Sequence, residues 1–141
     1  MKINNLIPVE CPNESSFFRA WMEFMTPFHK LTSREKDVAA RIIMQYFKFR
    51  ETVSDPEVLK ELLWSRSSRK DIMDSLKMSQ AHFQMVLAKL RTAGVIQNGT
   101  LYNKYIPDMI PGDSRFMLGI YFNWSSPKHP AKGGPEQDGK E

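Results

Sequence analysis

The stretch "KMSQAHFQMVLAKLRTAGVIQNGTLY", residues 77–102, decides the fold that this sequence predicts. Ser79 is of a type that caps helix N-termini, and apolar side chains then recur at helical spacing over 80–92. Gly94 follows where a left-handed glycine commonly ends a helix. Asn98-Gly99 is the strongest two-residue signal for a type I′ hairpin turn. The stretch therefore predicts a tight turn, a helix and a β-hairpin, in that order.

A second helix, over 69–76, is expected directly before this turn. The two helices of a helix-turn-helix touch at five of its twenty positions, and these positions must be apolar. Counted from residue 69, all five are apolar: Ile72, Leu76, Met78, Phe83 and Val86. The chain thus resembles the helix-turn-helix superfamily over 69–88. It departs from the family at Met73, which replaces a small residue, and at Lys77, which replaces the usual turn glycine.

The continuation "LRTAGVIQNGTLY" is similar to winged-helix proteins, in which the recognition helix ends in a leucine, basic residues and a glycine before the wing hairpin. This resemblance implies a protein that inserts helix 80–92 into the major groove of DNA. The opening "LTSREKDVAARII" resembles LuxR-type domains, but the helix that should follow it begins too far along the chain. The layout of helices followed by a wing also resembles small bacteriophage proteins of replication, late regulation or packaging.

Helical patterns also fill the chain before residue 65, with expected helices over 15–25, from a Thr32/Glu35 capping box to about residue 50, and over 56–64. Apolar residues alternate near the C-terminus and predict a half-buried strand over 115–124, beside the hairpin. Its buried face would consist of Phe116, Leu118, Ile120, Phe122 and Trp124. The predicted fold class is mainly α (α+β): a winged helix-turn-helix with an N-terminal helical extension, a β-hairpin wing and a C-terminal β-strand.

The length of 141 residues suits one domain with a real core. We expect an N-terminal arm over 1–14, the winged helix-turn-helix domain with its N-terminal helices over 15–124, and a flexible tail over 125–141. The tail has no apolar residue except Ala131, so it cannot offset the entropy of ordering.

Positive charge is concentrated on the helix-turn-helix motif. Residues 65–106 carry seven basic and two acidic side chains, whereas residues 1–64 are neutral overall. A local excess of this kind is the electrostatic footprint of a phosphate-binding face, although it is also compatible with an ordinary solvated surface. The candidate phosphate contacts are Arg66, Arg69, Lys70, Lys77, Arg91 and Lys104. Tyr102 and Tyr105 are either further contacts through their hydroxyls or ordinary strand residues.

The N-terminal end of helix 80–92 is expected to enter the groove first. Gln80 and Gln84 can read adenine through bidentate hydrogen bonds, and Ala81 and Met85 can touch thymine methyl groups. The candidate base contacts are Ser79, Gln80, His82, Gln84, Met85 and Lys89. The expected partner is double-stranded DNA. The protein would control either transcription or replication, and the sequence does not distinguish these two roles.

The first helix carries an aromatic stripe at helical spacing: Phe17, Trp21, Phe24 and Phe28. This stripe is either core or the contact of a homodimer, which a twofold DNA site would need. The rival interpretation is a structural or assembly protein, for example a phage virion or packaging component. In that case the outward residues Ala81, Met85 and Ala88 form a protein–protein contact.

Nothing in the sequence indicates catalysis, so we expect a protein that is not an enzyme and has no cofactor or metal. The three histidines are scattered, no Cys/His cluster has metal-ligand spacing, and there is no glycine-rich phosphate loop or nucleophile elbow. No apolar run approaches the roughly 18 residues of a membrane helix. Cys11 cannot form an internal disulfide, so we expect a cytoplasmic protein of a bacterium or a phage-infected host, with the virion as an alternative.

Overall fold

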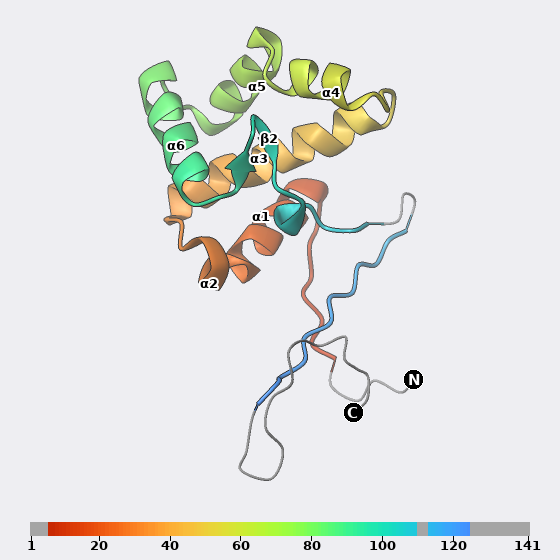
Figure 1. The fold of residues 1–141 in the computed structure, drawn as a ribbon. Helices are drawn as coiled ribbons and strands as arrows, with labels where there is room; N and C mark the ends of the chain where they lie inside the picture. The colour runs from red at the N-terminus through yellow and green to blue at the C-terminus, as the bar shows by residue number, and fades with distance from the viewer. Residues whose placement is uncertain (1–5, 110–112, 125–141) are drawn as a thin grey trace. The chain divides into compact units, whose positions relative to one another are not determined.

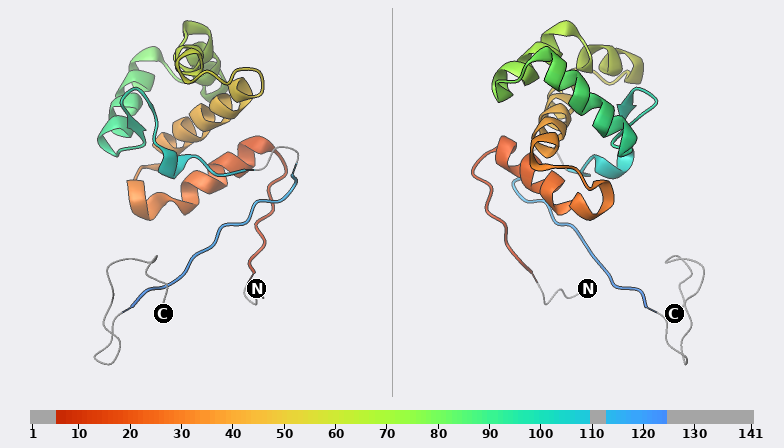
Figure 2. Two further views of the ribbon diagram at one scale, coloured as in Figure 1. Left: turned by 45° about the vertical axis from the view of Figure 1, so that its right-hand side comes forward. Right: turned by 90° about the vertical axis from the view of Figure 1, so that its left-hand side faces the viewer.

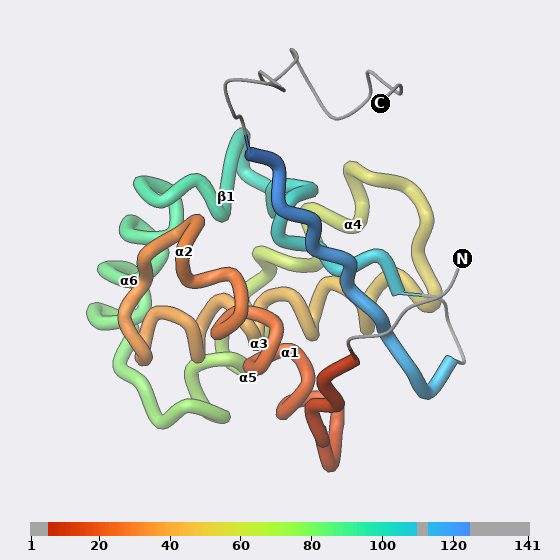
Figure 3. Tube along the Cα trace, turned by 90° about the horizontal axis from the view of Figure 1, so that it is seen from below, coloured from red at the N-terminus to blue at the C-terminus, as the bar shows by residue number. Residues whose placement is uncertain are grey.

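Helix α3 (Ser33–Arg50) runs through the first of two compact units in the computed structural model, and four other helices pack along it (Figure 1). The structure describes residues 6–109 and 113–124, and the two units are residues 1–107 and 108–141. The helices against α3 are α1 (Glu14–Phe24), α4 (Pro56–Leu63), α5 (Arg66–Leu76) and α6 (Gln80–Thr92). Seen from below, α6 and α4 lie toward opposite ends of α3 (Figure 3).

The helix α3 is buried on more than one side, as its wide apolar face predicts. Its central residues Val38, Ala39, Ile42 and Ile43 have no exposed surface. The predicted capping box forms at its start: the Thr32 hydroxyl accepts from the Glu35 N–H, and the Glu35 carboxylate accepts from the Thr32 N–H. The α3 helix therefore provides the apolar surface on which the remaining helices of this unit pack.

The short elements complete the first unit: α2 (Thr26–His29), β1 (Ile96–Gln97), β2 (Thr100–Leu101) and the 3-10 helix η1 (Asn103–Tyr105). Strands β1 and β2 form an antiparallel hairpin in which Ile96 pairs with Leu101. The turn residues Asn98 and Gly99 both have positive φ angles, 56° and 74°, as a type I′ turn requires. The described part of the chain is thus mainly helical, with one small two-stranded sheet.

Two helices begin earlier than the sequence predicts. The α5 helix starts at Arg66 rather than at residue 69, because the Ser65 hydroxyl accepts from the Ser68 N–H and caps it there. The first helix starts at Glu14, where the Asn13 side chain accepts from the Ser16 N–H. In both cases several possible caps follow one another, and sequence alone does not show which one is used.

The predicted C-terminal strand over 115–124 is wrong, since the structure has no strand anywhere in 113–124. Alternation records which side chains would share a face, but a strand also needs a neighbouring backbone to pair with. The hairpin strands are two residues each and offer no edge of matching length. The tail over 125–141 lies outside the described residues.

The aromatic stripe of the first helix is divided between core and surface. Trp21 is buried, and its indole N–H donates to the carbonyl oxygen of Tyr105 at 2.9 Å. This bond fixes α1 to the segment that follows the hairpin. Phe24 and Phe28 remain about half exposed, and Phe17 is half-buried. Trp21 is therefore committed to the core and is not part of a surface that a second copy could contact.

Candidate nucleic-acid interface

The five apolar positions of the α5–turn–α6 segment point inward, and α5 and α6 both pack on α3. Phe83, Val86, Ile72 and Met78 are buried, and Leu76 is half-buried. Lys77, which stands where the family usually has a turn glycine, adopts the left-handed conformation at φ 52°. The turn thus keeps the backbone geometry that favours glycine, although a lysine carries it.

Neighbouring elements fix both ends of this turn. The guanidinium of Arg34, on α3, donates a hydrogen bond to the carbonyl oxygen of Leu76, the last residue of α5. The Ser79 hydroxyl accepts from the His82 N–H at 3.1 Å and caps α6, as predicted. The end of α5 is therefore tied to α3 by a side-chain bond, and the start of α6 is fixed by its own cap.

The α6 helix divides sharply into a buried and an exposed face. Phe83, Val86, Leu87 and Leu90 are at most 3% exposed. Every other residue of the helix is exposed, including all predicted base contacts on it: Gln80, His82, Gln84, Met85 and Lys89. With α6 turned toward the viewer, this helix lies on the outside of the helical unit (Figure 2). At about 100° per residue, Gln80 and Gln84 lie along one edge of this accessible surface and His82 and Lys89 along the other, with Met85 between them.

Three basic residues at the two ends of α6 are exposed: Lys77, Lys89 and Arg91. Their side chains make no ion pair or hydrogen bond with any residue that the structure describes. Because an unpaired cation on a surface is free to meet an anion, these three are the strongest candidates for phosphate contacts.

The other predicted phosphate contacts are placed less favourably. Lys70 is paired with Asp74 at 2.8 Å, and this hydrogen bond raises the pKa of Lys70. Arg69 is half-buried, and its Nε atom is enclosed without a described partner. The ammonium group of Lys104 lies 4.6 Å from the ring centre of Phe28, on α2. Arg66 and Lys104 are both exposed without a described ion pair, but only Arg66 also lacks a described contact with an aromatic ring.

The tip of the β1–β2 hairpin is docked on the helical body. The indole N–H of Trp64, directly after α4, donates to the carbonyl oxygen of Gly99 at 2.7 Å. A Cβ atom on Gly99 would stand 2.9 Å from the side chain of Lys60, another residue of α4. Sequence reasoning missed both residues, because no local pattern shows which helix a hairpin tip will touch.

For Tyr105 the sequence leaves open a phosphate contact or an ordinary strand residue, and the structure places it in η1. It is 2% exposed, and burial raises the pKa of its hydroxyl. Its ring lies 5.8 Å from that of His29, so Tyr105 belongs to the core and not to a phosphate-contacting surface. Tyr102 is exposed, as a phosphate contact requires.

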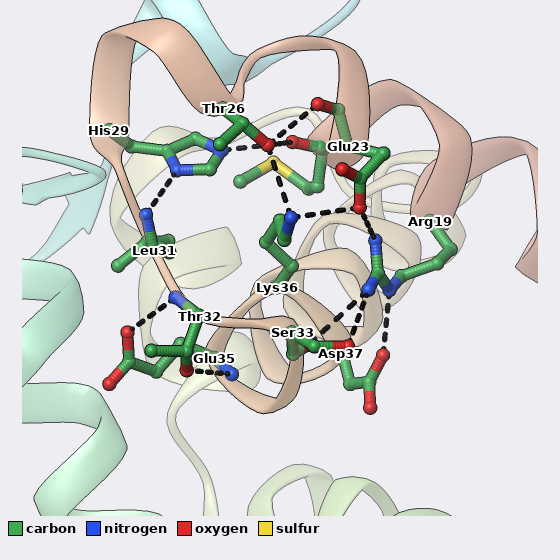
Figure 4. Close-up of polar contacts among 11 residues, drawn as sticks. Arg19, Glu23, Thr26, His29, Leu31, Thr32, Ser33, Glu35, Lys36 and Asp37 are labelled. Atoms are coloured by element: carbon green, nitrogen blue, oxygen red, sulfur yellow. Dashed lines mark hydrogen bonds and ion pairs between the residues drawn. The ribbon is translucent and has the colours of Figure 1, made fainter.

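A second cluster of charges lies between α1 and α3, away from the predicted interface (Figure 4). Arg19 bonds Asp37 at 2.7 Å and Glu23 at 2.9 Å. The ammonium group of Lys36, which is buried, bonds Glu23 at 2.8 Å and the Thr26 hydroxyl at 3.2 Å. The hydrogen bond from Lys36 lowers the pKa of Glu23. These charges neutralise one another, so the cluster holds α1 and α3 together and leaves little charge for a ligand.

Within 6–109 and 113–124, no group of three His, Cys, Asp or Glu side chains is arranged to hold a metal ion. A hollow of about 210 Å³ between α1 and α3 is lined by Arg19, Arg41 and Asp37, of which Arg19 and Asp37 already bond each other. Among the described helices none has the length and apolar character of a membrane span.

No family model, curated protein or solved structure matches the chain.

Proposed function

We propose that this chain is a double-stranded DNA-binding protein with a regulatory role, built as a winged helix-turn-helix that inserts α6 into the major groove. One observation carries the proposal. The exposed side of α6 presents Gln80, Gln84 and Arg91 along one edge and Lys89 along the other, and none of these side chains has a partner in the described part of the chain. The body of the protein holds α6 from behind and leaves this face open.

Base contacts and phosphate contacts are assigned to different parts of α6. Gln80 and Gln84 are one turn apart at its N-terminal end, where amide side chains can bond adenine in the major groove. Lys89 and Arg91 are near its C-terminal end, and Lys77 precedes it. These cations would bond phosphates on either side of the groove, which sets the position of the helix without reading sequence.

The docked hairpin limits what the wing contributes. In winged-helix proteins the hairpin supplies backbone contacts beside the recognition helix. Here its tip is bonded to Trp64, and Lys104 lies over Phe28. We therefore assign most of the phosphate contacts to the turn and to α6, with Arg66 as a further cation on α5.

The test is the double variant Lys89→Ala with Arg91→Ala, measured against random-sequence duplex over a series of salt concentrations. Loss of two phosphate contacts lowers the slope of log affinity against log salt by about 1.8, at about 0.9 per contact. The matched control is Lys48→Ala with Arg50→Ala, which removes the same two charges from the end of α3. Equal slopes for the two double variants would sink the proposal, because the effect would then come from net charge alone.

A second candidate is a structural or assembly protein, such as a virion or packaging component, in a phage-infected cell. Met85 favours it: this large apolar side chain is 65% exposed in the middle of α6, between Ala81 and Ala88. Such a row resembles a protein–protein contact as much as a groove-reading face. A gel shift with duplex at low salt, run beside a size measurement, separates the two. No shift together with a large defined oligomer selects the assembly role.

A further inference from the structure

The segment from Phe116 to Trp124, in the second unit, exposes more large apolar side chains than any other stretch of its length that the structure describes. Phe122 and Trp124 are 85% and 77% exposed, and Leu118 and Ile120 are exposed as well. Phe116 is half-buried. The segment runs without helix or turn (Figure 3). Contiguous exposed apolar surface of this kind marks an interaction site.

The composition of the segment is that of a strand, although no described strand pairs with it. Its even-numbered residues are all large and apolar, and the odd-numbered ones include Gly119 and Asn123. A nine-residue strand needs an edge of similar length, whereas β1 and β2 have two residues each. A partner of the right length is the same segment of a second copy.

The segment is complementary to itself in one antiparallel register. If Ile120 faces Ile120 of the second copy, Leu118 faces Phe122 and Phe116 faces Trp124. Only this antiparallel register pairs all five apolar residues of the face with one another. On the other face, Tyr121 comes opposite Gly119, and an aromatic ring over a cross-strand glycine is a stabilising pair.

Charge selects the antiparallel direction over the parallel one. The segment is preceded by Arg115 and contains no acidic residue. In a parallel pair the two Arg115 side chains would be neighbours, and like charges side by side destabilise a strand pair. In the antiparallel pair they lie at opposite ends, about 30 Å apart at about 3.4 Å per residue.

We propose that residues 116–124 pair antiparallel with the same residues of a second copy and form a twofold-symmetric dimer. Pairing of the two strands sets the five apolar side chains of each copy beside those of the other, and such cross-strand apolar and aromatic pairs stabilise a strand pair. The dimer is independent of DNA binding, and it moves the contact from the first helix, where Trp21 is buried, to the C-terminal segment.

The experiment compares two aspartate variants of the full chain, Ile120→Asp and Met117→Asp, by light scattering after size exclusion and by sedimentation. The two side chains are equally exposed, at 61%, but lie on opposite faces of the segment. Ile120→Asp places two carboxylates opposite each other and removes two apolar side chains from the pair. We expect it to raise the dimer Kd at least about a hundredfold. Met117→Asp should change the Kd less than about threefold.

Variants with opposite charges at position 120 add a second measurement, because a nonspecific apolar association would not depend on the sign of these charges. Mixed Ile120→Lys and Ile120→Asp chains should form a heterodimer under conditions in which each variant alone is monomeric. Both variants lie outside the first unit, so circular dichroism should show its helices unchanged. A monomeric unaltered chain overturns the proposal and leaves the segment to another partner. Equal losses for the two aspartate variants, or no heterodimer, overturn it too.

Discussion

Basic side chains are paired at the junction between α1 and α3 and unpaired on the exposed face of α6. At the junction, Arg19 and Lys36 are bonded to carboxylates at 2.7–2.9 Å. On and beside α6, Lys77, Lys89 and Arg91 have no described partner. Both regions contain basic side chains, yet in the first the charge stabilises the fold and in the second it remains available.

This difference explains why local net charge is a weak guide to a binding surface. Residues 65–106 have the larger excess, but within them Lys70 is paired with Asp74 and Lys104 lies over an aromatic ring. The charge that a ligand can use is therefore smaller than the sequence total and is concentrated around α6. The three predictions below test this division, beginning with the largest effect.

The largest difference is expected between two lysines. Lys36 is buried and bonds both Glu23 and Thr26, whereas Lys89 is exposed. Lys36→Ala should lower the free energy of unfolding by about 1.5–3 kcal/mol, because it removes buried bonds of a charged group. Lys89→Ala should change it by less than about 0.5 kcal/mol, as surface substitutions usually do. Urea unfolding at equal protein concentration measures both values.

Lys36→Met tests which part of Lys36 matters at the junction. Methionine keeps an apolar stem and removes only the ammonium group, so a loss that persists in Lys36→Met comes from the bonds to Glu23 and Thr26. Similar losses for Lys36→Ala and Lys89→Ala would contradict the division between the two regions, because both lysines would then stabilise the fold.

A smaller effect is expected from His29, which lies beside the junction (Figure 4). Its Nδ1 atom accepts from the Leu31 N–H and its Nε2 atom lies 2.9 Å from the Met22 carbonyl oxygen, so the ring is held as the neutral Nε2–H tautomer. Burial lowers the pKa of His29, and the nearby Lys36 charge lowers it further. The hydrogen bond to Met22 and the Glu23 charge raise the pKa of His29, but they only partly offset this lowering.

The lowered pKa fixes the sign of the pH dependence. The unfolded chain binds the proton more readily, with a pKa of about 6.5. The contribution of His29 to stability is therefore complete above about pH 6.5 and is lost as the pH falls toward the folded-state value. The free energy of unfolding, measured across this pH range, should fall as the pH falls. In His29→Gln the part of this decrease that comes from His29 should be absent. His82→Gln serves as the control because His82 is exposed. An unchanged profile for His29→Gln would contradict the assignment.

The features that the sequence predicted correctly are those that depend on neighbours in the chain. The Thr32/Glu35 box, the bounds of α6 and the Asn98-Gly99 turn all follow from residues a few positions apart. The failures depend on distant contacts. Trp64 meets Gly99 across 35 residues and Trp21 meets Tyr105 across 84. The strand over 115–124 fails for the same reason, because a strand is defined by its partner.

The same limit applies to the candidate interface. Helical periodicity separates the buried face of α6 from its exposed face, and the structure agrees residue by residue. Which of the exposed cations is already paired depends on side chains from other turns and other helices, as with Lys70 and Lys104. The sequence therefore predicts the set of candidate residues, and only the packed structure ranks them.

The smallest effect distinguishes base contacts from phosphate contacts on the same helix. In a duplex selected from random sequences, replacing thymine by uracil removes only the methyl group. If Ala81 and Met85 touch such methyl groups, affinity falls about fourfold for each one, from about 0.8 kcal/mol per buried carbon. Met85→Ala should lose part of this preference for thymine, whereas Lys89→Ala with Arg91→Ala should keep it and bind both duplexes more weakly. If the unaltered chain binds both duplexes equally, α6 contacts phosphates alone, and its exposed apolar residues are then better explained by contact with a protein.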